Sequence, residues 1–80
     1  MAENAIMQEQ RVYRLRLAGR LDEEFVAAYC PAGTVLSEEE QATVLADIFT
    51  DQSGFVGLIR HLHNLGITIL AMDSCRRRQS

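Results

Sequence analysis

The chain contains no lysine and no tryptophan, only one proline, and two cysteines among its 80 residues. Its eight basic residues are therefore all arginines, and three of them follow one another as Arg76, Arg77 and Arg78. The other five stand against eleven Asp and Glu residues, and the net charge of the whole chain is −3. Because binding to phosphates requires a basic face, this acidic body argues against nucleic acid as a partner.

Long apolar runs are also missing. No stretch approaches the roughly 20 apolar residues of a membrane span, so we expect no membrane partner. The first ten residues carry neither the basic region nor the apolar core of a secretory signal. We therefore expect a cytoplasmic protein, in which Cys30 and Cys75 are reduced thiols.

The residues that are present are typical of a packed domain, with 48% apolar and 6% aromatic residues. A chain of this length forms one domain and buries only about 60% of its unfolded surface, so its stability is marginal. We predict a flexible leader over residues 1–10, a single domain over residues 11–75 and a basic tail over residues 76–80.

The first half of the domain predicts a strand followed by a short helix. From residue 11 onward, Tyr13, Leu15 and Leu17 alternate with polar or small residues, which is the pattern of a strand with one buried face. Asp22 is followed by two glutamates, as at a helix N-terminus. The helix should end near Cys30, because Pro31 cannot continue it.

The second half predicts a hairpin, a longer helix and a last strand. Residues 33–37 and 42–49 form the two strands of the hairpin, with a polar tip at residues 38–41. Asp51 caps the second helix, Gly66 ends it, and residues 67–72 form the fourth strand. Apolar residues recur along that helix at helical spacing: Phe55, Leu58, Ile59, Leu62 and Leu65.

The predicted element order is β-α-β-β-α-β. Right-handed crossovers through each helix, with a hairpin between them, give an α+β ferredoxin-like sandwich. Its antiparallel sheet has the strand order 4-1-3-2, and both helices cover one face of the sheet.

The third and fourth strands are apolar on both sides if they alternate regularly. Val44, Ala46 and Ile48 would then oppose Leu45 and Phe49, and in the fourth strand Leu70 and Met72 would oppose Ile67, Ile69 and Ala71. Such strands are usually covered on both faces, whereas the helices cover only one.

We therefore predict a two-fold homodimer through the open sheet face, in which Arg14 and Arg16 meet Asp47 or other acids of the second copy. The predicted interface residues are Val12, Arg14, Arg16, Leu45, Asp47, Phe49, Leu70 and Met72. The alternatives are that another protein covers this face, or that the chain is a monomer with scattered apolar residues on its surface.

No residue cluster has the spacing of a catalytic or metal site. His61 and His63 lie about 200° apart around the helix axis and cannot share one metal ion. No zinc-type spacing occurs, and no serine has a nearby His with a supporting carboxylate. We predict no catalytic residues, no metal and no cofactor, and hence a protein that is not an enzyme.

The segment DQSGFVGLIRHLHNLGITILAMD (residues 51–73) and, more loosely, YRLRLAGRLDEEF (residues 13–25) resemble a family of small uncharacterised bacterial proteins. That family has a DQxxLHGLL-like helix followed by an LGxxLL-like strand, and the match covers most of residues 12–73. The distinctive positions are Asp51, Gln52, Gly57, Leu58, Leu65 and Gly66. The sequence departs from the pattern at Val56, where His is typical, at His63, where Arg is usual, and at Asn64, which replaces Asp. The resemblance implies no activity, and any role of that His would be absent here.

Composition and fold together favour a noncatalytic protein-interaction or regulatory module. The alternative is a small-ligand sensor that resembles the ACT domain, which shares the element order and has a glycine after its first strand, as Gly19 is here. An enzyme built on a dimeric ferredoxin-like barrel is less favoured, because the inner face is almost wholly aliphatic. An RNA-recognition domain is the least favoured, because the central strands lack paired exposed aromatics.

Overall fold

The structure, a computed structural model, describes residues 10–76, and for Arg76 it describes the backbone only. The predicted leader, apart from Gln10, and the predicted basic tail beyond Arg76 lie outside these residues. The elements follow the predicted order β-α-β-β-α-β. They are β1 (Arg11–Ala18), α2 (Glu23–Tyr29), β2 (Val35–Glu39), β3 (Ala42–Thr50), α3 (Gln52–Asn64) and β4 (Ile69–Arg76).

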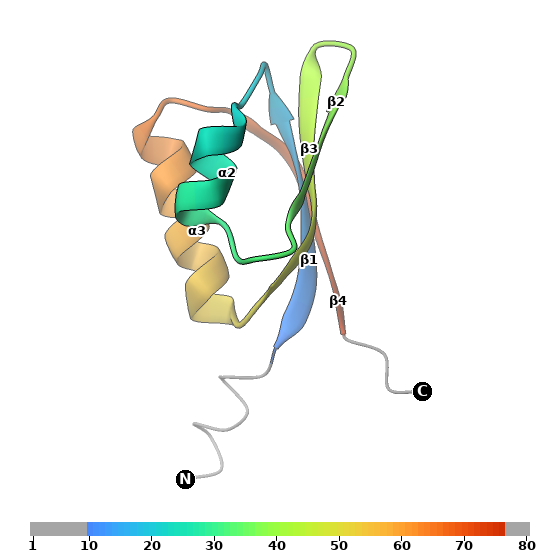
Figure 1. The fold of residues 1–80 in the computed structure, drawn as a ribbon, viewed down its shortest axis with the longest axis vertical. Coiled ribbons are helices and arrows are strands. Elements are labelled where there is room, and N and C mark those ends of the chain that lie inside the picture. The colour runs from blue at the N-terminus through green and yellow to red at the C-terminus, as the bar shows by residue number, and fades with distance from the viewer. Residues whose placement is uncertain (1–9, 77–80) are drawn as a thin grey trace, which may run out of the picture.

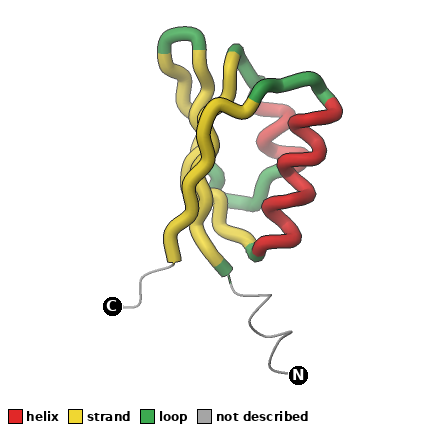
Figure 2. The backbone as a smooth tube through the Cα atoms, turned by 180° about the vertical axis from the view of Figure 1, so that it is seen from behind, coloured by secondary structure: helices red, strands yellow, loops and turns green. Residues whose placement is uncertain are grey.

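The four strands form one sheet in the order β2-β3-β1-β4, and each neighbouring pair is antiparallel. The predicted order 4-1-3-2 gives the same neighbours when it is read from the other edge. Both helices lie on one side of the sheet, and the β2–β3 hairpin extends beyond them (Figures 1 and 2). The predicted α+β class, with two helices on an antiparallel sheet, is confirmed.

Local sequence signals fix both ends of the two helices. The Asp22 carboxylate accepts a hydrogen bond from the Phe25 amide at 3.1 Å, and the Asp51 carboxylate accepts one from the Gly54 amide at 2.8 Å. These are the two predicted caps. The predicted breaker residue Pro31 directly follows the cap residue that ends α2.

Gly66 ends α3 as predicted, with a positive φ of 78°. Its amide donates to the His63 carbonyl at 2.9 Å, and the Ile67 amide donates to the Leu62 carbonyl at 3.1 Å. This pair of bonds is the Schellman motif, which satisfies carbonyl groups that the end of the helix leaves free. The motif turns the chain back toward the sheet, where Ile67 packs against the core.

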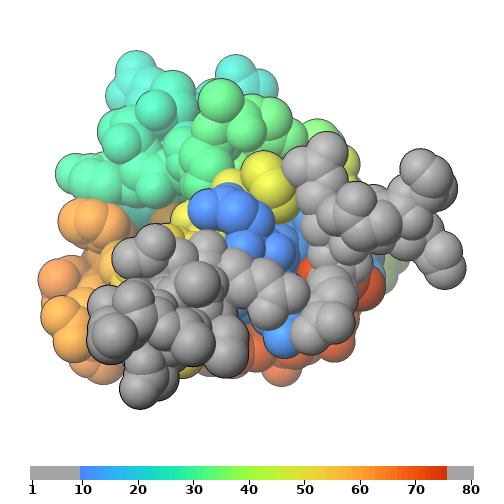
Figure 3. Space-filling view, turned by 90° about the horizontal axis from the view of Figure 1, so that it is seen from below, coloured from blue at the N-terminus to red at the C-terminus, as the bar shows by residue number. Residues whose placement is uncertain are grey.

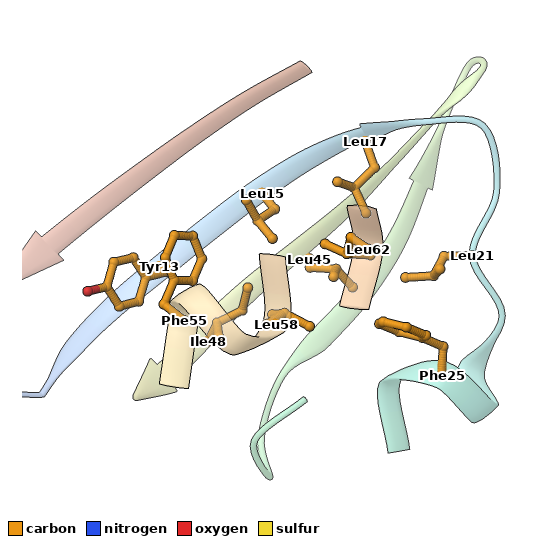
Figure 4. Close-up of a cluster of buried hydrophobic side chains, with 10 residues drawn as sticks. All are labelled: Tyr13, Leu15, Leu17, Leu21, Phe25, Leu45, Ile48, Phe55, Leu58 and Leu62. Carbon is orange, nitrogen blue, oxygen red and sulfur yellow. The ribbon is translucent and has the colours of Figure 1, made fainter. Parts of the chain in front are cut away.

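The core lies between the sheet and the helices (Figure 4). Leu15 of β1, Leu45 of β3 and Leu62 of α3 have no exposed surface. At one end of the core, the rings of Tyr13 and Phe55 stack in parallel, with centroids 3.9 Å apart. Fully buried side chains therefore join α3 to the central strands β1 and β3.

The two helices also contact each other. The rings of Tyr29 on α2 and His61 on α3 lie 4.2 Å apart between centroids. Seen along the long axis of the molecule, the surface of α2 and its following loop lies beside that of α3 (Figure 3). Together they form one helical layer.

A β-bulge in β3 corrects the predicted placement of Leu45. Tyr13 pairs with Ile48, and Leu15 pairs with Leu45. Two residues of β3, Ala46 and Asp47, therefore stand opposite one residue of β1, Arg14. The extra residue reverses the alternation, and Leu45 and Ile48 both point into the core. The prediction that Leu45 lies on the open sheet face is therefore wrong.

A second bulge in β4 corrects the placement of Met72. Arg16 pairs with Ala71, whereas Leu17 pairs with Ile69, which leaves Leu70 as the extra residue. Met72 pairs with the core residue Leu15 and so belongs to the helix side of the sheet, although 53% of it is exposed. The predicted position of Met72 on the open face is also wrong.

The bulge in β3 depends on a residue that tolerates a left-handed backbone, because Asp47 has a φ of 57°. We predict that Asp47→Val lowers the free energy of unfolding by about 1–2 kcal/mol, since a β-branched side chain is strongly disfavoured there. Asp47→Asn removes the same charge but suits this conformation, so it should leave the protein about 1 kcal/mol more stable than Asp47→Val does. Urea denaturation at one fixed protein concentration measures both, and equal stability of the two variants would contradict this reading of the bulge.

Candidate functional site

The candidate site is the open face, defined as the side of the sheet opposite the helices in the part of the chain that the structure describes. Cross-strand pairing identifies its residues, because directly paired residues share a face. They are Val12, Arg14, Arg16 and Ala18 of β1, Ala71, Asp73 and Cys75 of β4, Ala42, Val44, Ala46 and Phe49 of β3, and Val35, Ser37 and Glu39 of β2. Four of the predicted interface residues, Val12, Arg14, Arg16 and Phe49, lie here. Asp47 borders the face at the bulge, and Leu70 is the extra residue of the β4 bulge.

An ion pair crosses the part of the open face that lies over β3 and β2. Arg16 Nε lies 3.1 Å from Glu39 Oε1. Because β3 separates the strands that carry these residues, the pair passes over the β3 residues that neighbour them, Val44 and Ala42. Val44 and Ala42 are only 3% and 5% exposed, although no described helix lies above them. The aliphatic part of a long arginine side chain can cover apolar surface of this kind.

This ion pair changes the predicted role of Arg16. The sequence predicted that it would meet an acid of a second copy, whereas in the structure it meets an acid of its own chain. Both side chains are about half exposed, at 51% and 45%, so the electrostatic part of the contact contributes at most about 1 kcal/mol. Its main effect is to cover apolar surface next to the hairpin.

The other half of the open face, over β1 and β4, contains a hollow of about 400 Å³. Arg14 lines this hollow, and Asp73 of β4 stands opposite it in the register of the two strands. Asp47 borders the hollow from the β3 bulge. Among residues 10–76, none of these three charged groups forms an ion pair. The remaining lining residues are Val12, Tyr13, Ala46, Ser74 and Cys75.

Sequence reasoning missed Asp73 and Cys75 as residues of this face. The fourth strand was expected to end at Met72, whereas it continues to Arg76. The signal that could have found Asp73 is its opposite charge to Arg14, since oppositely charged residues favour direct cross-strand positions. Using that signal requires the register of the strands, which the bulge at Leu70 sets.

A second hollow, of about 440 Å³, lies beside α2 and the loop that follows it. Cys30 lines it and is half-buried, and burial raises the pKa of its thiol. The reactive form of a cysteine is the thiolate, so this shift makes Cys30 a poor nucleophile at neutral pH. Cys75, by contrast, is exposed on the open face, and neither cysteine forms a disulfide.

Within the described part of the chain, no three or more His, Cys, Asp or Glu side chains are grouped so that they could hold a metal ion. The two histidines differ in their surroundings, since His61 contacts Tyr29 on the neighbouring helix. Across residues 10–76, no helix has the length and apolar character needed to cross a membrane.

The sequence pattern of a protein family described as a domain of unknown function (DUF8691) matches residues 12–73, and the chain belongs to this family. The matched segment begins in β1 and ends in β4, so it includes both helices and the open face. No curated protein and no solved structure matches the chain. The resemblance by helix and strand motifs stays a prediction.

The two cysteines should react at different rates. At pH 8, and at a protein concentration low enough to keep the chain monomeric, we expect iodoacetamide to modify Cys75 first, because Cys75 is exposed while Cys30 is half-buried with a raised pKa. The rate at Cys30 should continue to rise at higher pH. The pKa of Cys30 is higher in the folded than in the unfolded state, so the folded state loses stability as the pH rises from the unfolded-state pKa through the folded-state pKa. Mass spectrometry of timed samples locates the label, and faster labelling of Cys30 at pH 8 would show that its thiol is not shielded.

Proposed function

We propose that this member of the DUF8691 family is a noncatalytic protein-interaction module with a ferredoxin-like fold, and that it forms a homodimer through the open face. The element order β-α-β-β-α-β and the strand order support the ferredoxin-like part of this proposal. The noncatalytic role rests on the sequence, which has no catalytic or metal-site spacing. The proposed site of action is the cytoplasm, as the sequence predicts.

One observation carries the proposal: the half of the open face over β1 and β4 has no described cover. Val12 is only partly buried there and Ala71 is exposed, and Ala46 of the neighbouring β3 is also only partly buried. At the adjoining sheet edge, Leu70 is 49% exposed. Apolar surface that is grouped on one side of a sheet favours an interface.

A second copy suits this surface better than an unrelated partner. The face carries basic and acidic side chains at neighbouring positions, Arg14 beside Asp73, so that it can complement itself across a two-fold axis. A chain of this size also gains from association, because it buries a small share of its own surface. The Arg16–Glu39 pair crosses the open face beside Val44 and Ala42, which favours a contact centred on the hollow over β1 and β4.

The dimer can be tested with paired substitutions on opposite sides of the sheet. We expect wild-type protein to be a dimer at low micromolar concentration, and Val12→Glu with Ala71→Glu to raise the dimer Kd at least tenfold, because four carboxylates would be brought into one contact. Size-exclusion chromatography with light scattering measures the mass, and circular dichroism checks that the variant is folded. Leu45 is unsuitable for this test because it is fully buried.

The matched control is Val56→Glu with Leu65→Glu. These two side chains of α3 and its C-cap are 42% and 60% exposed and lie in the helical layer, so the control should remain a dimer. A wild-type monomer, or equal dimerisation of all three proteins, would contradict the proposal. A monomer whose melting temperature rises with an amino acid would instead support the ACT-like alternative.

A further inference from the structure

The hollow on the open face has an unusual arrangement of charge. Arg14 on β1 lies between two acids, with Asp73 on the neighbouring strand and Asp47 at the β3 bulge. Although all three line one hollow, none forms an ion pair within residues 10–76. Arg16, two residues along the same strand, does pair with an acid of its own chain. The three groups of the hollow are therefore available to a partner.

The lengths of the side chains indicate where the partner charge would come from. Side chains on a strand stand roughly perpendicular to the sheet, so the long Arg14 side chain can reach farther from the sheet than the short carboxylates beside it. Two sheets that pack face to face lie about 10 Å apart. An arginine extended across that gap can reach the carboxylates of the facing sheet.

Resting on the proposed homodimer, we propose that Arg14 of each copy enters the hollow of the other and binds between its Asp47 and Asp73. In a two-fold interface every contact occurs twice, so one arginine supplies two reciprocal sets of ion pairs close to the axis. The planar guanidinium has five N–H donors and can serve two carboxylates at once. Water is excluded between the packed sheets, which strengthens the attraction.

This arrangement also gives the bulge in β3 a role. Asp47 is the residue with a positive φ in that strand, and β-bulges commonly redirect a side chain at a functional position. In a regular strand, β3 would place a single side chain opposite Arg14. The bulge adds a residue there, so that Asp47 borders the hollow on the side opposite Asp73.

Charge-reversal variants test the reciprocal contact. Arg14→Asp alone and Asp73→Arg alone should each raise the homodimer Kd at least tenfold, because like charges then face each other across the axis. The double variant, Arg14→Asp with Asp73→Arg, should form a tighter dimer than Arg14→Asp alone without reaching wild type, because the exchanged pair attracts again while the unchanged Asp47 repels the new carboxylate. The control is Arg60→Asp, at an exposed position of α3. It makes the same change of charge in the helical layer and should leave the Kd unchanged. Sedimentation velocity measures the Kd, and circular dichroism verifies folding.

Mixing the two single variants separates contacts between copies from contacts within one copy. In an equimolar mixture, the acidic hollow of Arg14→Asp meets two arginines of Asp73→Arg, so heterodimers should exceed both homodimers in native mass spectrometry. If wild type dimerises but the mixture gives no excess of heterodimer, this inference is overturned and the proposed function stands. An effect of Arg60→Asp equal to that of Arg14→Asp overturns it as well, and a monomeric wild type overturns both proposals.

Discussion

The contact of α3 with the central strands β1 and β3 is the one on which the rest of the structure depends. Leu62, Leu15 and Leu45 meet there without any exposed surface. Each such side chain contributes about 1.5–3 kcal/mol by its burial, which is a large share of the 5–15 kcal/mol that typically stabilises a domain. The shorter α2 adds Phe25 as its buried residue. Both helices of residues 10–76 lie on one side of the sheet, so neither of them covers the other side.

The two β-bulges reconcile this single core with strands that are apolar almost throughout. In β3, the bulge directs Leu45 and Ile48 to the same side, so that two large residues enter the core. The smaller Ala42 and Val44 remain on the open face, where the Arg16–Glu39 pair covers them. The open face is therefore less apolar over β3 than regular alternation predicts. The charged hollow lies over β1 and β4, while Val35 of β2 is exposed toward the opposite edge of the same face.

Helix ends could be predicted from the sequence, because they depend on neighbouring residues. The sheet face on which a strand residue lies could not, because it depends on how the strands pair. The helix caps and the stop at Gly66 depend on side chains within a few residues, and the element order follows from them. The faces of Leu45 and Met72 were predicted incorrectly because one extra residue in a strand puts the residues before it and after it out of step, so that one regular alternation cannot describe both parts. The only local sign of the β3 bulge is an aspartate, a residue that tolerates positive φ. Asp73 was missed for the same reason, since its place opposite Arg14 depends on the second bulge.

A second copy is proposed to cover the open face over β1 and β4. The most direct measurement is the relaxation of methyl protons by a soluble paramagnetic compound, recorded by NMR at high and at low protein concentration. Val12 lies on the open face, and Val56 is exposed on α3. If a second copy covers this face, the Val12 methyls become protected from the paramagnetic compound at high protein concentration, while the Val56 methyls stay accessible to it. Equal relaxation of Val12 at both concentrations, in a sample shown to be dimeric at the higher one, would contradict it.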